Sequence, residues 1–105
     1  MDAQARYEEI VDDLIHRNAD VEAAKMMGMP AIKKAGKMVG GFWRDSMVFK
    51  LPDEMDRLAA LTLEGAHLFD PSERNRPMKE WVVVPAAHAA EWARLAELAL
   101  IRRAG

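Results

Sequence analysis

Residues that could do chemistry are few in this sequence, and the histidines come first. Two candidate pairs join a histidine to a carboxylate three residues away, Glu64-x-x-His67 and His88-x-x-Glu91. A carboxylate and an imidazole at this spacing share a helix face and can bind a metal. Gly65 interrupts the first pair, so only His88 and Glu91 remain as a candidate. A solvated helix face is the favoured interpretation, and we expect no metal site and no cofactor.

Nucleophiles are equally scarce. The chain has no cysteine, its hydroxyl side chains besides the tyrosine are Ser46, Thr62 and Ser72, and no Gly-x-Ser-x-Gly elbow is present. The glycines of Gly36-x-x-x-Gly40-Gly41 lack the Gly-Lys-Ser/Thr ending of a phosphate loop, so they predict a turn and a bend. We therefore expect no catalytic residue.

Positive charge is concentrated in one segment. Residues 25–50 carry six bases and one acid, whereas residues 1–24 carry seven acids and two bases, in a chain of net charge -2. The candidate binding residues here are Lys33, Lys34, Lys37 and Arg44, with Phe42, Trp43 and Phe49 interleaved. Cations beside aromatics suit single-stranded nucleic acid. The alternative is that the lysines protect sheet edges and the aromatics are core, and we favour it because the whole chain is acidic.

A second candidate pair, Arg76 and Lys79, flanks a proline before the most apolar strand. These cations could hold a carboxylate ligand, or they could form ion pairs with Asp70 or Glu73, which we favour. A small enzyme with a pocket near Arg76, Lys79 and His88 is the alternative to a non-catalytic protein.

Composition places the chain among ordinary globular domains. Its 105 residues are 50% hydrophobic and 30% charged, which suits a single domain spanning 1–105. The absence of cysteine, of a signal-peptide pattern and of a long apolar run predicts a cytoplasmic protein without a membrane partner. The eight methionines fill core gaps or form an adaptable binding surface, and we favour the core.

Hydrophobic periodicity predicts the element order α-β-β-β-α-β-β-α. A first helix covers 3–18, with Tyr7, Ile10, Val11, Leu14 and Ile15 as its apolar stripe. A meander follows, with strands at 31–34, 38–43 and 47–51, and the Gly40-Gly41 pair indicates a bulge or a close backbone approach.

The second half of the chain continues this α+β pattern. Pro52 opens a second helix, whose inner face is expected to hold Met55, Leu58, Ala59 and Thr62, and Gly65 is the expected left-handed cap. Strands at 66–69 and 81–84 enclose a polar loop at 70–75, and a last helix covers 86–103 with Trp92, Leu95, Ala96 and Ala99 inside.

The strand 81–84 is apolar on both faces, so both faces must be covered. Helices on both sides of the sheet would do this, and so would a homodimer contact on one side.

Four segments form a recognisable set: Lys25-Met26-Met27-Gly28, Gly36-Lys37-Met38, Phe69-Asp70 and, most specifically, Arg76-Pro77-Met78-Lys79-Glu80-Trp81-Val82-Val83-Val84. With these segments the chain resembles the N-terminal domain of the TfoX/Sxy family. The motif residues are Met26, Gly28, Pro77, Met78 and Trp81. The resemblance implies a two-layer α+β sandwich with a five-stranded antiparallel sheet, similar to secretion chaperones. It also implies kinship with bacterial regulators of competence for DNA transformation, and it supplies no catalytic residue.

These patterns favour a non-catalytic binding or regulatory module. The expected partner is a protein or a second copy of the chain, with nucleic acid as the less favoured choice.

Overall fold

The computed structural model describes residues 2–101. Helix α1 (Ala3–Arg17) begins at the cap residue Asp2, whose carboxylate accepts a hydrogen bond from the backbone N–H of Gln4. Its buried stripe is Tyr7, Ile10, Val11 and Leu14, whereas Ile15, predicted to be part of it, is 38% exposed. The helix ends at Asn18, whose backbone N–H and side-chain amide both donate to the carbonyl of Leu14.

Four strands follow, β1 (Val21–Met26), β2 (Met29–Lys34), β3 (Lys37–Trp43) and β4 (Ser46–Lys50), as an antiparallel meander. Each connection is a two-residue turn with positive φ at both residues, at 27–28, 35–36 and 44–45. Such turns match the right-handed twist of the strands that they join. The strands expected at 31–34, 38–43 and 47–51 are confirmed, but β1 was not predicted.

Glycines allow two close backbone approaches in this meander, as the pair Gly40-Gly41 predicted. A Cβ at Gly40 would lie 2.9 Å from the carbonyl oxygen of Val48. A Cβ at Gly41 would lie 2.7 Å from the carbonyl oxygen of Pro30. The register of β2 against β3 also shifts beside Gly40, between Ile32 and Lys33, so the predicted bulge is present.

Helix α2 (Glu54–Leu61) is capped by Asp53, whose carboxylate accepts from the N–H of Asp56. The predicted inner face is wrong: Met55 is 76% exposed, Leu58 is 50% exposed, and Ala59 and Thr62 are also exposed. Ala60 is buried instead, next to Leu61. The side of α2 that faces the core is therefore the one with Ala60 and Leu61. Gly65 has the expected positive φ of 84°, although the helix has already ended.

Strands β5 (His67–Phe69) and β6 (Met78–Pro85) complete one six-stranded antiparallel sheet in the order β1-β2-β3-β4-β6-β5. The prediction of a five-stranded sheet is wrong, because it did not include β1. The interior position of β6 explains its apolar run, because both of its neighbours are strands and both of its faces are buried.

The last predicted helix is divided. Residues Ala86–Glu91 form a 3-10 helix, η1, in which His88 has non-helical angles, and α3 (Trp92–Ile101) follows. The predicted inner residues of α3 are buried, and the indole N–H of Trp92 donates to the carbonyl of Val84 at 3.1 Å. The predicted helix end at 102–103 lies outside the described residues.

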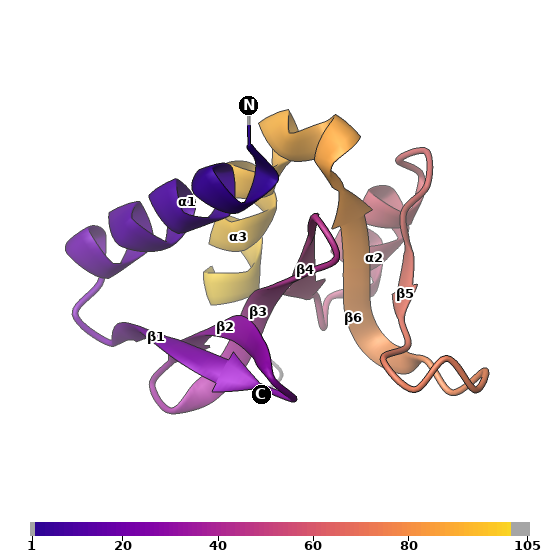
Figure 1. The fold of residues 1–105 in the computed structure, drawn as a ribbon, viewed down its shortest axis with the longest axis horizontal. Helices are drawn as coiled ribbons and strands as arrows, with labels where there is room; N and C mark the ends of the chain where they lie inside the picture. The colour runs from indigo at the N-terminus through magenta and orange to yellow at the C-terminus, as the bar shows by residue number, and fades with distance from the viewer. Residues whose placement is uncertain (1, 102–105) are drawn as a thin grey trace.

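The buried residues of all three α-helices belong to one hydrophobic cluster on a single side of the sheet. Figure 1 shows α1 and α3 next to the strands β1–β3, and α2 close to β6. We call the opposite side of the sheet the helix-free face. Within residues 2–101, no helix combines the length and apolar character that a membrane crossing requires.

Candidate binding surface on the helix-free face

Strand alternation sorts the side chains of the sheet between its two faces. Val82 and Val84 of β6 enter the helix-side cluster, whereas Trp81 and Val83 join a second cluster on the helix-free face. The buried members of this second cluster are Met29, Val48, Phe69, Trp81 and Val83, with Met26, Met38, Trp43 and Met78 partly buried around them. The helix-free face is therefore a small second core with a rim of thioethers and one indole.

The sheet's own twist covers this second core. Trp43 lies on β3 and Phe69 on β5, three strands away, which would separate them by about 14 Å in a flat sheet. Their ring centroids are 5.2 Å apart in an edge-to-face arrangement. Strong twisting of the sheet must therefore raise these two corners towards each other, and Val48 and Val83 beneath them are fully buried.

A charged cluster lies over the same corner. The guanidinium of Arg44 stands 4.3 Å from the ring centroid of Trp43 and forms an ion pair with Glu73 at 2.5 Å. Both charged side chains are more than half exposed, so the ion pair adds little stability by itself. It does connect the β3–β4 turn to the loop between β5 and β6, in addition to the ring contact.

That loop is organised by one carboxylate. Asp70 accepts hydrogen bonds from the hydroxyl of Ser72 and from the backbone N–H groups of Ser72, Glu73 and Arg76. These donors, the Ser72 hydroxyl foremost, hold the pKa of Asp70 below its usual value. The spacing Asp70-x-Ser72 is typical of such side-chain turns and could have predicted this arrangement.

The four candidate cations of the basic segment do not form one site. Lys33, Lys34 and Lys37 surround the β2–β3 turn, while Arg44 is at the other end of β3, about 20 Å away. Lys34 is 2.8 Å from a carboxylate oxygen of Asp20, and Lys33 faces Glu22 in the strand register.

The aromatics of this segment are also divided. Phe42 contacts Tyr7 on the helix side, with ring centroids 5.2 Å apart, and Phe49 is buried in the helix-side cluster. Of the three aromatics, Trp43 alone contacts a cation, and that cation is Arg44. This arrangement therefore does not support the hypothesis that several bases of a single-stranded nucleic acid stack on Phe42, Trp43 and Phe49.

Arg76 and Lys79 are exposed, and no ion pair is recorded for either side chain within residues 2–101. The favoured interpretation, a pair with Asp70 or Glu73, is wrong. Asp70 binds the backbone of Arg76, and Glu73 binds Arg44. His88 lies beyond the far end of β6, about 20 Å from Lys79, so these side chains do not converge on one pocket.

His88 and Glu91, the candidate metal-binding pair, each interact with a different residue. Nε2 of His88 is 2.8 Å from the carbonyl oxygen of Glu64, and Glu91 forms an ion pair with Arg94 at 2.7 Å. Over the described part of the chain, no three His, Asp or Glu side chains are grouped as metal ligands.

Three of the five motif residues, Met26, Met78 and Trp81, belong to the helix-free face. Gly28 forms the β1–β2 turn with φ of 79°, and Pro77 precedes β6. Lys50 also lies on this face, because it pairs with Trp81 in the register of β4 and β6.

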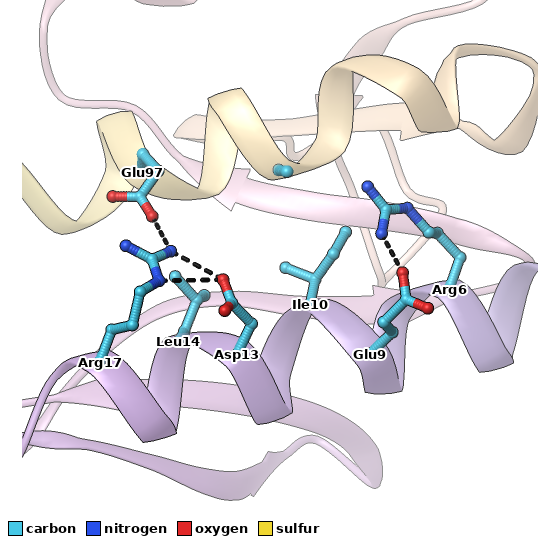
Figure 2. A pocket seen from close by; sticks show the side chains of 8 residues that line it. Arg6, Glu9, Ile10, Asp13, Leu14, Arg17 and Glu97 are labelled. Carbon is cyan, nitrogen blue, oxygen red and sulfur yellow. Dashed lines mark hydrogen bonds and ion pairs between the residues drawn. The ribbon is translucent and has the colours of Figure 1, made fainter.

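A groove of about 330 Å³ lies between α1 and α3, and it is charge-balanced (Figure 2). Arg6 is paired with Glu9 at one end, and Arg17 with Asp13 and Glu97 at the other. Ile10 and Leu14 form its floor. Because each arginine already has a carboxylate, the groove offers no free charge to a ligand.

Comparison with known proteins gives no match, whether to a family model, a curated protein or a solved structure. The similarity to the TfoX/Sxy family stays a prediction.

Proposed function

We propose that the chain is a non-catalytic binding module that holds a protein partner on its helix-free face. The observation that carries this proposal is the composition of that face. Partly exposed Met26, Met38, Met78 and Trp43 surround a buried apolar centre, and among residues 2–101 no helix residue belongs to this cluster. Methionine-rich surfaces adapt to different apolar side chains, and tryptophan supplies a large rigid contact.

The charges at the face favour an acidic partner. Lys50 lies on the helix-free face, and Lys79 lies near the start of β6. Neither side chain has an ion pair among residues 2–101. The partner that fits is a protein segment with apolar anchors and flanking carboxylates. A regulatory role of the kind implied by the TfoX/Sxy resemblance would operate through such a contact.

Charge reversal on the face tests the proposal. Affinity purification from the native host with the wild type and with Lys50→Glu should yield a protein that only the wild type retains. Calorimetric titration of that purified protein should then show binding weakened about tenfold by Lys50→Glu. Arg94→Glu, the same charge change on α3 at the other side of the sheet, should bind as the wild type does.

Two results would contradict the proposal. One is equal retention of every partner by Lys50→Glu and the wild type. The other is binding of a labelled 20-nucleotide single strand that weakens steeply between 50 and 200 mM salt, which would make the face a nucleic-acid surface.

A further inference from the structure

The two edges of the sheet differ in how open they are to another strand. The β5 edge has three residues, and its register against β6 shifts between Leu68 and Phe69. The β1 edge has six residues in uninterrupted register with β2, and it contains neither proline nor bulge. Proteins usually protect edge strands by short length, bulges, prolines or charges. By these criteria β5 is protected, and β1 has only the charges of Glu22 and Lys25.

The backbone groups at the open edge can be assigned from the turn. Met26 and Met29 flank a two-residue turn and therefore form a hydrogen-bonded pair, and hydrogen-bonded and non-bonded pairs alternate along the ladder. Lys25 and Ala23 are then in non-bonded pairs with β2, so their N–H and C=O groups point outwards. Proline at the partner of Lys25, Pro30, is consistent with this assignment, since proline has no N–H to donate.

The side chains along the edge leave room for a second strand. Ala23 is exposed and Ala24 is half-buried, and both are small. A groove of about 220 Å³ lies between α1 and the β1–β2 hairpin. Its side-chain lining includes Tyr7, Glu8, Val11, Asp12, Ala23 and Pro30.

The charges beside this groove are unpaired and of both signs. On α1, Glu9 and Asp13 have arginine partners, but no ion pair is recorded among residues 2–101 for Glu8 or Asp12. Like charges at i, i+4 repel each other unless a cation joins them. Lys25 is exposed on the same side of β1, because strand alternation places it with Ala23 towards α1, and it too has no recorded ion pair.

We propose that a second copy of this chain adds its β1 antiparallel to β1, around a two-fold axis at Ala24, so that two sheets join into one of twelve strands. In this register Ala24 faces Ala24 of the second copy, and Lys25 faces Ala23. Ala23 and Lys25 exchange the outward-pointing hydrogen bonds described above. The two-fold axis is perpendicular to the sheet, so the helices of both copies lie on the same side of the joined sheet. Each Lys25 then lies beside Glu8 and Asp12 of the other copy, and the contact is isologous.

Sedimentation velocity on the full chain tests the assembly. The wild type should form dimers at tens of micromolar, and Lys25→Glu should raise the dissociation constant about tenfold or more, because the change occurs twice per dimer. Glu8→Lys with Asp12→Lys should also weaken the dimer, and combination with Lys25→Glu should restore it. A wild type that remains monomeric at 100 micromolar overturns the proposal, as does a dimer that Lys25→Glu leaves unchanged.

A single cysteine tests the register, because the chain has none of its own. A non-bonded antiparallel pair has Cα atoms about 4.5 Å apart, which lies within the range that a disulfide spans. Mild oxidation of Ala24→Cys should therefore give a covalent dimer at dilute protein concentration. Leu58→Cys, an exposed control on α2, should give much less. Efficient cross-linking of Ala23→Cys but not of Ala24→Cys would overturn the register.

Discussion

The substitution Gly41→Ala tests the close approach of β2 to β3 that shapes the helix-free face. A Cβ there would lie 2.6 Å from Cε of Met29 and 2.7 Å from the carbonyl oxygen of Pro30. The methionine can move, since its terminal carbon is the end of a flexible side chain. The carbonyl cannot move without disturbing the pairing of Ala31 with Gly41.

We expect Gly41→Ala to lower the free energy of unfolding by about 3 kcal/mol, the upper part of the usual range for an overpacked site. The midpoint of thermal unfolding should fall by about 15 °C in a domain of this size. Urea denaturation followed by circular dichroism measures the first quantity, and a thermal melt measures the second. The matched control is Gly28→Ala, where φ is 79° and nothing lies within 4 Å, so only the left-handed backbone costs about 1 kcal/mol.

A second variant separates the two contacts. If the carbonyl of Pro30 is the obstacle, Met29→Ala combined with Gly41→Ala stays no more stable than Gly41→Ala alone. Recovery of stability in the double variant would show that the side chain was the obstacle. A loss below 1 kcal/mol for Gly41→Ala would refute the reasoning altogether.

Three further predictions concern single polar groups. The hydroxyl of Tyr7 is buried without a hydrogen-bond partner among the described residues, and burial raises its pKa, so Tyr7→Phe should increase the free energy of unfolding by about 1 kcal/mol in urea titrations. The carboxylate of Asp70 has a lowered pKa, so its ionised form orders the loop above the unfolded pKa of about 3.9, and this contribution is lost as the pH falls through the lower folded value. The amide resonance of Arg76 should report that transition between pH 5 and 2, and Asp70→Ala should abolish it. At α2, Asp53→Ala should cost about 1 kcal/mol of unfolding free energy and Asp53→Asn much less, because asparagine retains a capping oxygen.

The sequence predicted the elements whose residues are apolar on a helical period or in an unbroken run. Strand β6 was predicted because three consecutive valines follow Trp81 and Pro85 ends the run. The stripe on α1 was predicted up to Leu14. In both cases burial selects the residue types directly, so the local pattern is sufficient.

Strand β1 was missed for an equally local reason. Its central residues are Ala23 and Ala24, which favour neither strand nor alternation, and its turn has Met27 where Asn or Asp is more usual. Gly28 at the second turn position, with a run of similar length on either side, was the available signal. Without β1, the sequence could not indicate which strand forms this edge of the sheet, so the dimer contact proposed at β1 could not be predicted.

The contacts at the helix-free face could not be predicted from local patterns at all. Trp43 and Phe69 meet because twist accumulates across four strands, and the pair Arg44–Glu73 depends on the same geometry. The four candidate cations were grouped because they are close in sequence. In space the seven-residue strand β3 separates Arg44 from the three lysines, because the turns at 35–36 and 44–45 lie at opposite ends of this strand.

The proposed dimer and the proposed binding face have a geometric relation that makes them testable together. A two-fold axis perpendicular to the joined sheet places both helix-free faces on the same side, so one partner molecule with two binding segments could contact both. Linking two contacts raises the apparent affinity through effective concentration, without any new contact. Lys25→Glu, which acts at the edge, should therefore weaken binding of a two-segment partner and leave binding of one isolated segment unchanged. Lys50→Glu, which acts on the face, should weaken both. Equal effects of the two substitutions on an isolated segment would mean that the edge and the face form one site.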